Sequence, residues 1–111
     1  MFAWMTVRRI KPGMLADFKR GWRAGPGAGT VDPYSGVTAV LLLEDVNDPG
    51  RMIGLGVFEN RQAYDRYRAS EIEADRQFAI APYVEAVEEE RWFELTSYGS
   101  IPATTDLLGS Q

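Results

Sequence analysis

The sequence contains no cysteine and no histidine. Without cysteine the chain has no disulfide bond, no thiolate nucleophile and no cysteine-ligated zinc or iron–sulfur centre. Without histidine it lacks the commonest general acid or base at neutral pH, the commonest metal ligand and the imidazole of catalytic triads. Any proton transfer must therefore use a carboxylate, a tyrosine, a lysine, water or the substrate itself.

The chain is also short of basic charge and of long apolar runs. It has 12 Lys and Arg against 16 Asp and Glu, a formal net charge of −4, and its basic residues are scattered. Nucleic-acid binders concentrate positive charge to neutralise phosphates, so we expect no nucleic-acid partner. No stretch approaches the roughly 20 apolar residues of a membrane span, and no targeting segment is recognisable. We therefore expect a soluble, cytoplasmic protein without a membrane partner.

The length of 111 residues, with 45% hydrophobic and 25% charged residues, suits one globular domain. We expect this domain to span residues 1–98. A tail over residues 99–111, rich in Ser, Thr, Pro and Gly and without hydrophobic periodicity, follows it.

Alternating and helical spacings of apolar residues predict the secondary structure. The predicted elements are strand 2–10, helix 14–24, strands 37–45 and 51–59 joined as a hairpin, a helix from 60 to about 68 with a second piece after 70, and strand 87–98. Asn60 is a plausible N-cap, and Ser70 with Glu73 has the pattern of a capping box. Gly54 and Gly56 share one strand face, where they leave room either for large side chains opposite or for close approach of the backbone.

This order predicts an α+β, ferredoxin-like β-α-β-β-α-β fold, in which a four-stranded antiparallel sheet carries both helices on one face. The other face would be bare. The strand at 37–45 is apolar on both sides, because Ala39, Leu41 and Leu43 alternate with Val40 and Leu42. A monomer would expose an apolar patch that soluble proteins rarely tolerate, so we predict a homodimer with its two sheets face to face.

Particular residues within this order resemble a known family. They are Arg9-Ile10-Lys11-Pro12-Gly13, then Gly36-Val37-Thr38, Leu43-Glu44-Asp45-Val46-Asn47-Asp48-Pro49, Val57-Phe58-Glu59-Asn60, Ala63-Tyr64, Tyr67-Arg68-Ala69-Ser70 and Ala81-Pro82-Tyr83. With them the chain, from Phe2 to about Leu95, resembles the antibiotic biosynthesis monooxygenase (ABM) branch of the dimeric α/β-barrel superfamily.

The resemblance implies a pocket between the sheet and the two helices of each subunit. The residues that it would bring there are Trp4, Phe18, Trp22, Tyr64, Arg76, Gln77 and Phe78 for substrate binding, and Thr6, Asn60 and Tyr67 for catalysis. Monooxygenases of this family oxidise polycyclic phenols or quinols with molecular oxygen, without flavin or metal. We therefore predict a monooxygenase with no cofactor and no metal, acting on a small aromatic or polycyclic phenol or quinol.

Several of the candidate residues also have a purely structural interpretation. The tryptophans and Phe18 could be ordinary core, and Thr6 a strand residue with its hydrogen bond satisfied. Asn60 could be only a helix cap. Tyr67 could relay protons, although a phenol with a pKa near 10 would need a neighbouring cation such as Arg76.

Another branch of the superfamily degrades heme, using an asparagine on the first strand and a tryptophan and a ligating histidine around the second helix. Thr6, Tyr67 and either Gln77 or Arg76 stand at the corresponding positions here, so we do not expect heme degradation. Two other functions stay open for the same pocket. They are a non-catalytic ligand-binding or stress-response role, and isomerase or cyclase activity.

Overall fold

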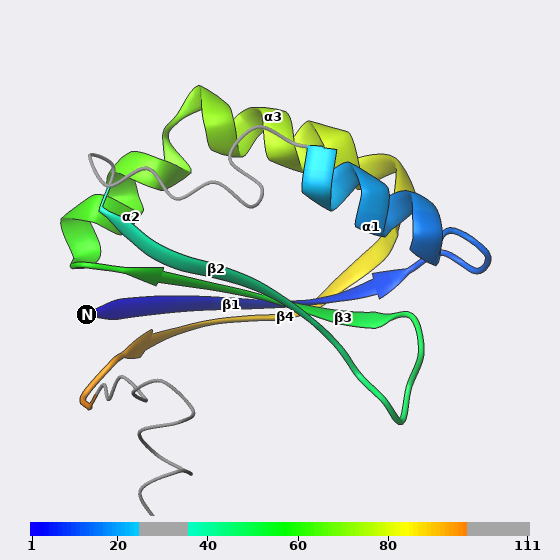
Figure 1. Ribbon diagram of the computed structural model, residues 1–111, viewed down its shortest axis with the longest axis horizontal. Helices are drawn as coiled ribbons and strands as arrows, with labels where there is room; N and C mark the ends of the chain where they lie inside the picture. The colour runs from blue at the N-terminus through cyan, green and yellow to red at the C-terminus, as the bar shows by residue number, and fades with distance from the viewer. Residues whose placement is uncertain (25–35, 98–111) are drawn as a thin grey trace, which may run out of the picture.

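The computed structural model describes residues 1–24 and 36–97. Its elements are β1 (Phe2–Ile10), α1 (Leu15–Ala24), β2 (Val37–Glu44), β3 (Arg51–Phe58), α2 (Arg61–Arg68), α3 (Glu71–Ile80), the 3-10 turn η1 (Ala81–Tyr83) and β4 (Val84–Glu94). The strands form one antiparallel sheet in the order β2-β3-β1-β4, and the helices lie on one face of it (Figure 1). This is the predicted ferredoxin-like α+β fold, with the second helix divided into α2 and α3.

Strand β1 lies at the centre of the sheet, between β3 and β4. Its alternate side chains from Phe2 to Ile10 face the helices and separate two apolar clusters. One cluster gathers Phe2, Trp4, Val37, Phe58, Ala63, Tyr64 and Tyr67, and the other gathers Ile10, Phe18, Trp22, Met52 and Ile80. Thr6 and Arg8 lie between the clusters on this same face, so polar groups interrupt the core at its middle.

Side chains at the helix starts confirm both predicted caps. Asn60 Oδ1 accepts a hydrogen bond from the backbone N–H of Ala63 at 2.8 Å, and Ser70 Oγ accepts one from the N–H of Glu73 at 3.2 Å. These bonds satisfy N–H groups that the first helical turn leaves free. The capping box at α3 is only half formed, because the N–H of Ser70 bonds to the carbonyl of Tyr67 and the Glu73 carboxylate is buried.

The last strand differs from its predicted range of 87–98. It begins at Val84, because the 3-10 turn that contains Pro82 delivers the chain directly to the end of β1, where Val84 pairs with Ile10. It ends at Glu94, which pairs with Phe2 at the other end of β1. The residues between the predicted helix 14–24 and the predicted strand 37–45, and the predicted tail over 99–111, fall largely on 25–35 and 98–111, outside the described residues.

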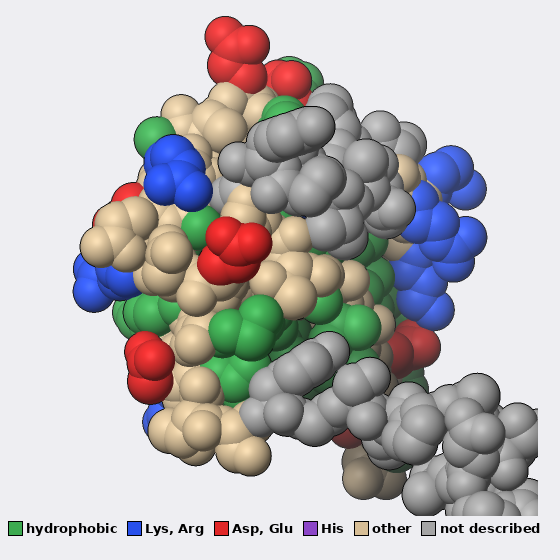
Figure 2. Space-filling model, turned by 60° about the vertical axis from the view of Figure 1, so that its left-hand side comes forward, with side chains coloured by type: hydrophobic (Ala, Val, Ile, Leu, Met, Phe, Trp, Pro, Cys, Tyr) green, Lys and Arg blue, Asp and Glu red, His purple; other side chains and the backbone are tan. Residues whose placement is uncertain are grey.

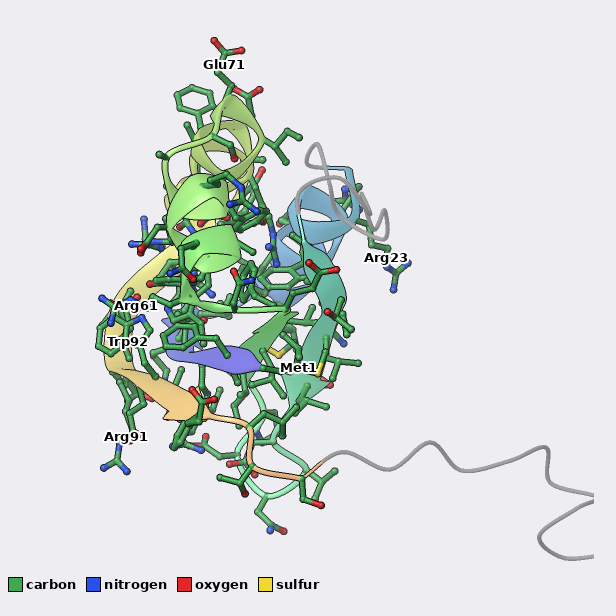
Figure 3. The ribbon with its side chains drawn as sticks, turned by 90° about the vertical axis from the view of Figure 1, so that its left-hand side faces the viewer. Met1, Arg23, Arg61, Glu71, Arg91 and Trp92 are labelled. Atoms are coloured by element: carbon green, nitrogen blue, oxygen red, sulfur yellow. The ribbon has the colours of Figure 1, made fainter. Side chains whose placement is uncertain are left out.

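The sheet face opposite the helices is apolar, and no described helix covers it (Figure 1). Leu41, Leu43 and Phe93 are 46%, 47% and 43% exposed. Figure 2 shows hydrophobic side chains reaching the surface at the level of the sheet. Neighbouring residues of β4 point to opposite faces of the sheet: Trp92 lies on the helix side, and Arg91 points to the open side (Figure 3). The prediction that β2 is apolar on both sides is confirmed.

Among the described residues, no helix has the length and hydrophobicity to span a membrane.

Candidate active site

A small cavity lies between the middle of the sheet and the helices. It is lined by Trp4, Thr6, Arg8, Trp22, Val40, Gly54, Leu55, Gly56, Phe58, Tyr67, Arg76 and Gln77. Its volume is about 10 Å³, which is the room that one water molecule needs. The predicted pocket therefore exists in the predicted place, but side chains nearly fill it.

Two glycines of β3 leave space for the cavity's aromatic wall. A Cβ on Gly54 would lie 2.9 Å from Thr6 Oγ1 and 3.0 Å from Trp22 Cη2. A Cβ on Gly56 would lie 3.0 Å from Phe58 Cε2. Contacts this short are repulsive in a close-packed interior, so larger residues would displace these neighbours. The interpretation of both glycines as room for large side chains is confirmed.

Five polar residues beside the cavity form what we call the buried polar cluster: Thr6, Arg8, Tyr67, Glu73 and Arg76. Arg8 Nη1 donates a hydrogen bond to Thr6 Oγ1 at 2.7 Å, and Arg76 Nη1 donates one to the Tyr67 hydroxyl at 2.9 Å. Arg8, Glu73 and Arg76 are only 5%, 3% and 4% exposed. Burying charge is unfavourable unless it is well paired, so the pairing of these groups decides what the site can do.

Glu73 is the carboxylate of this cluster, and its pairing is incomplete. Its Oε1 accepts a hydrogen bond from Gln77 Nε2 at 2.6 Å and lies 3.7 Å from Arg68 Nη1. Its Oε2 lies 4.0 Å from Arg76 Nη1 and has no hydrogen-bond partner. The Glu73 carboxylate is therefore shared between two arginines, and neither lies within hydrogen-bond distance of it.

Aromatic rings hold the same two guanidinium groups. The Arg76 guanidinium lies 3.6 Å from the ring centroid of Trp22, and that of Arg68 lies 4.3 Å from the ring centroid of Trp4. The negative face of an indole attracts a cation, more strongly when water is excluded. Trp22 thereby both fills the cavity and stabilises the arginine behind it.

Burial and the positive charge of Arg76 together lower the pKa of Arg8 from its ordinary value to about 10. The carboxylates of Glu73 and Glu90 oppose this shift without cancelling it. Arg8 stays charged at neutral pH, in a place where its charge is poorly compensated.

We expect Arg8→Met to raise the free energy of unfolding by about 1 to 3 kcal/mol, because methionine fills the space without the buried charge. Since folding lowers the pKa of Arg8, its charge destabilises the folded state fully below about pH 10, and the penalty declines as the pH rises from there towards the ordinary pKa of arginine. Urea unfolding at neutral pH measures the gain, with Arg66→Met, at an exposed arginine, as the control. A clear loss of stability would show that the hydrogen bond to Thr6 outweighs the burial penalty.

Burial raises the pKa of the Tyr67 phenol above its ordinary value of 10. The Arg76 guanidinium lowers it, as a proton relay would need, but this is outweighed by burial together with Glu73. Tyr67 therefore stays protonated at neutral pH. It is suited to donate a hydrogen bond or a proton to a ligand oxygen and is a poor general base.

The structure brings six of the ten predicted site residues to the cavity: Trp4, Thr6, Trp22, Tyr67, Arg76 and Gln77. Phe18 is fully buried beside Trp22 as core, with 6.1 Å between ring centroids. Tyr64 is core as well, and its hydroxyl accepts a hydrogen bond from Trp92 Nε1 at 2.6 Å.

Phe78 and Asn60 also lie away from the cavity. Phe78 is 83% exposed, because α3 turns Glu73, Arg76 and Ile80 towards the sheet and leaves Phe78 on its outer side. Phe78 therefore does not line the pocket to which the resemblance assigned it, whereas its neighbour Gln77 does. Asn60 caps α2, and its amide oxygen is engaged with the helix N-terminus.

We expect Asn60→Ala to lower the free energy of unfolding by about 1 kcal/mol, the usual effect of losing an N-cap. Ligand binding should be unchanged, since Asn60 is not among the cavity-lining residues. Thermal unfolding with and without a bound ligand measures both effects, and Asn60→Ser, which keeps a capping oxygen, is the control. A loss of binding at unchanged stability would restore Asn60 as a site residue.

Sequence reasoning missed Arg8, Glu73 and Glu90 as groups of the site. Glu90 Oε2 accepts a hydrogen bond from Trp4 Nε1 at 3.0 Å and so fixes one wall of the cavity. The sequence signal for Arg8 was its position in β1, where the alternation of side chains puts it on the same face of the strand as Phe2, Trp4 and Ile10. A charge on a face that is otherwise apolar is a signal for a buried functional group.

Among the described residues, no group of three or more Asp and Glu side chains is arranged to hold a metal ion. The two carboxylates at the site, Glu73 and Glu90, are engaged with arginines, Gln77 or Trp4.

The chain has the fold of solved proteins described as antibiotic biosynthesis monooxygenases, as the resemblance predicted. A protein of Chloroflexus aurantiacus with that provisional description superposes with a TM-score of 0.71 at 15% identity, over 88% of this chain and 96% of that one. For similarly described proteins of Nitrosomonas europaea and Deinococcus radiodurans the TM-score is 0.72, at 13% and 15% identity. These cover 87% and 93% of this chain and 100% of their own. No protein-family model and no curated protein sequence matches the chain.

Proposed function

We propose that the protein is a cofactor-independent monooxygenase that oxidises an aromatic or polycyclic phenol or quinol with molecular oxygen. The observation that carries the proposal is the hydrogen bond between Arg76 and the Tyr67 hydroxyl, at the wall of an aromatic-lined cavity. The shared fold supports it, since the solved structures with this fold include proteins described as antibiotic biosynthesis monooxygenases.

In this reaction the substrate supplies the electrons. A ring carbon that carries two hydrogens beside the phenol system becomes a carbonyl: one atom of oxygen becomes the carbonyl oxygen, and the other leaves as water with the two hydrogens. The protein binds the ring system, excludes bulk water and supplies polar groups at fixed positions. Tyr67 keeps its proton at neutral pH and can donate it to reduced oxygen, while Arg76 orients the hydroxyl.

Binding requires the cavity to enlarge, because about 10 Å³ admits no more than a water molecule. Trp22 is the side chain best placed to move. It belongs to the last turn of α1, and its Cη2 reaches the space that Gly54 leaves open. A substrate ring that replaces the Trp22 indole would find the same neighbours, Gly54 beneath it and the Arg76 guanidinium against its face.

We expect the enzyme to consume oxygen with members of a panel of anthrones and quinols. Tyr67→Phe should lower kcat by about 100-fold, the usual contribution of a positioned proton donor. Tyr64→Phe is the matched control, because it also removes one phenolic hydroxyl but lies outside the cavity lining. An oxygen electrode measures both rates. Folded protein that leaves every member of the panel unoxidised would refute the proposal.

We also propose that the protein works as a homodimer built on the open sheet face. Leu41→Glu should dissociate it, because a charge at this half-exposed position would be buried against the partner. Phe78→Glu is the control, since it places the same charge at an exposed apolar residue on the opposite side of the molecule. Analytical ultracentrifugation measures the outcome. A monomeric parent protein at micromolar concentration would contradict this assembly.

The near-filled cavity favours a second candidate, a ligand-binding protein of the same fold without catalysis. In that case aromatic ligands would bind to the dimer, and no oxygen would be consumed with any of them.

A further inference from the structure

The cavity has an excess of buried positive charge. Arg8 and Arg76 both line it and are 5% and 4% exposed, and Glu73, at 3%, is the buried carboxylate that faces them. Glu73 also lies 3.7 Å from a third arginine, Arg68, so its charge is shared. A buried cation without a full partner is strongly unfavourable, and it persists where a function requires it.

The unmade hydrogen bonds point the same way. Within residues 1–24 and 36–97, the side-chain partner of Arg8 is the neutral hydroxyl of Thr6, and no carboxylate lies within ion-pairing distance of its guanidinium. Arg76 Nε is buried without any hydrogen-bond partner. The two guanidinium groups repel each other closely enough to lower the pKa of Arg8. The cavity wall therefore has hydrogen-bond donors and positive charge, but too few hydrogen-bond acceptors that carry negative charge.

The aromatic side chains around Arg76 indicate the shape of a ligand that would fit the cavity. The ring centroid of Trp22 lies 3.6 Å from the guanidinium carbon of Arg76, and both side chains line the cavity. The closed site therefore already accommodates a two-ring aromatic group on the arginine. A ligand that displaces this indole has to offer the same planar surface, and gains if it also brings a negative charge.

We propose that the cavity binds a planar, fused-ring aromatic anion, with its phenolate or carboxylate oxygen between Arg8 and Arg76 and its rings in the place of the Trp22 indole. For the phenolate case the inference rests on the proposed function and names its substrate class: a phenol that binds as the anion. The two arginines then favour ionisation of the phenol in a chain that has no histidine. They stabilise the ionised phenol, which is the electron-rich form that can reduce oxygen.

The direct test compares an anion with a neutral molecule of the same shape. Naphthoate and naphthamide are titrated into the intact protein by calorimetry. We expect naphthoate to bind at least about tenfold more tightly, the effect of one charge-assisted hydrogen bond or more. Equal affinities, preference for the amide, or no binding of either would overturn the proposal.

Variants test whether the preference for naphthoate over naphthamide arises in the cavity. Arg8→Gln should reduce the naphthoate preference to less than about threefold, while Arg66→Gln, which removes an exposed arginine from α2, should leave it unchanged. Equal effects of both variants would overturn the assignment, because they would indicate general attraction by surface charge. If Arg8→Gln fails to fold, the comparison of the two ligands on the parent protein still decides.

A third ligand separates the two sources of charge. Nitronaphthol changes its visible absorption when it ionises, so a lowered pKa in the bound state reports a phenolate in the site. Ionisation of nitronaphthol on binding supports the proposed substrate class. If naphthoate binds but nitronaphthol binds as the neutral phenol, the site is restricted to carboxylates, and the proposal of a bound phenolate is overturned. Oxygen uptake is measured separately. Anion binding without uptake refutes the proposed function alone, and uptake without anion preference refutes this inference alone.

Discussion

Replacement of Glu73 by alanine is expected to lower the free energy of unfolding by about 3 to 5 kcal/mol, the range for removing one partner from a buried charge group. The carboxylate is 3% exposed and lies among Arg68, Arg76 and the amide of Gln77. Its removal would leave Arg76 buried without a counter-charge and would further destabilise the charged form of Arg8.

Urea unfolding of the protein at neutral pH measures this loss. Glu71→Ala is the matched control, because it removes the same charge from the first turn of the same helix, where Glu71 projects away from the sheet (Figure 3). We expect the control to change stability by less than about 1 kcal/mol. If the two variants were equally stable, the buried arginines would need no counter-ion from Glu73. The argument for an unbalanced positive site would then fail.

Replacement of Trp22 by alanine is expected to have two opposite consequences. Stability should fall by about 3 to 5 kcal/mol, the range for truncating a large buried aromatic residue. Ligand affinity should rise by about tenfold. Without the indole, every molecule would have an open cavity, so no binding energy would be spent on moving the indole out. A merely structural tryptophan would give the first effect without the second.

Thermal unfolding and naphthoate calorimetry on the same variant separate these two effects. Trp92→Ala is the control, since Trp92 is half-exposed on β4 and lies outside the cavity lining. It should lose stability through its hydrogen bond to Tyr64 but leave naphthoate affinity within about twofold of the parent. Weaker naphthoate binding in Trp22→Ala would show that the indole is part of the binding surface. The idea that it occupies the ligand's place would then be wrong.

Local sequence was sufficient to predict most of the elements. Strand β1 has its predicted bounds, and both N-caps, Asn60 and Ser70, begin the helices that they were expected to begin. These features depend on a few neighbouring residues, so a single sequence carries them. The last strand was placed three residues too late at its start, because its beginning depends on pairing with Ile10, more than seventy positions away.

The candidate site was predictable in outline only. Tyr67 and Arg76 were expected near each other, and their hydrogen bond is present. The direction of the Tyr67 pKa was not predictable, because it results from burial and from Glu73 as well as from Arg76. The resemblance assigned Phe78 to the pocket, although the packed side of α3 is set by Glu73, Arg76 and Ile80.

The sequence by itself determined the fold and its chemical limits. The alternation of apolar residues decided which segments are strands, and the lack of histidine and cysteine decided which reactions are excluded. Only the tertiary structure decided that Arg8 and Arg76 share one small cavity with a single poorly paired carboxylate. Charge balance in a buried site depends on distances between segments far apart in the chain, and no local pattern records those distances.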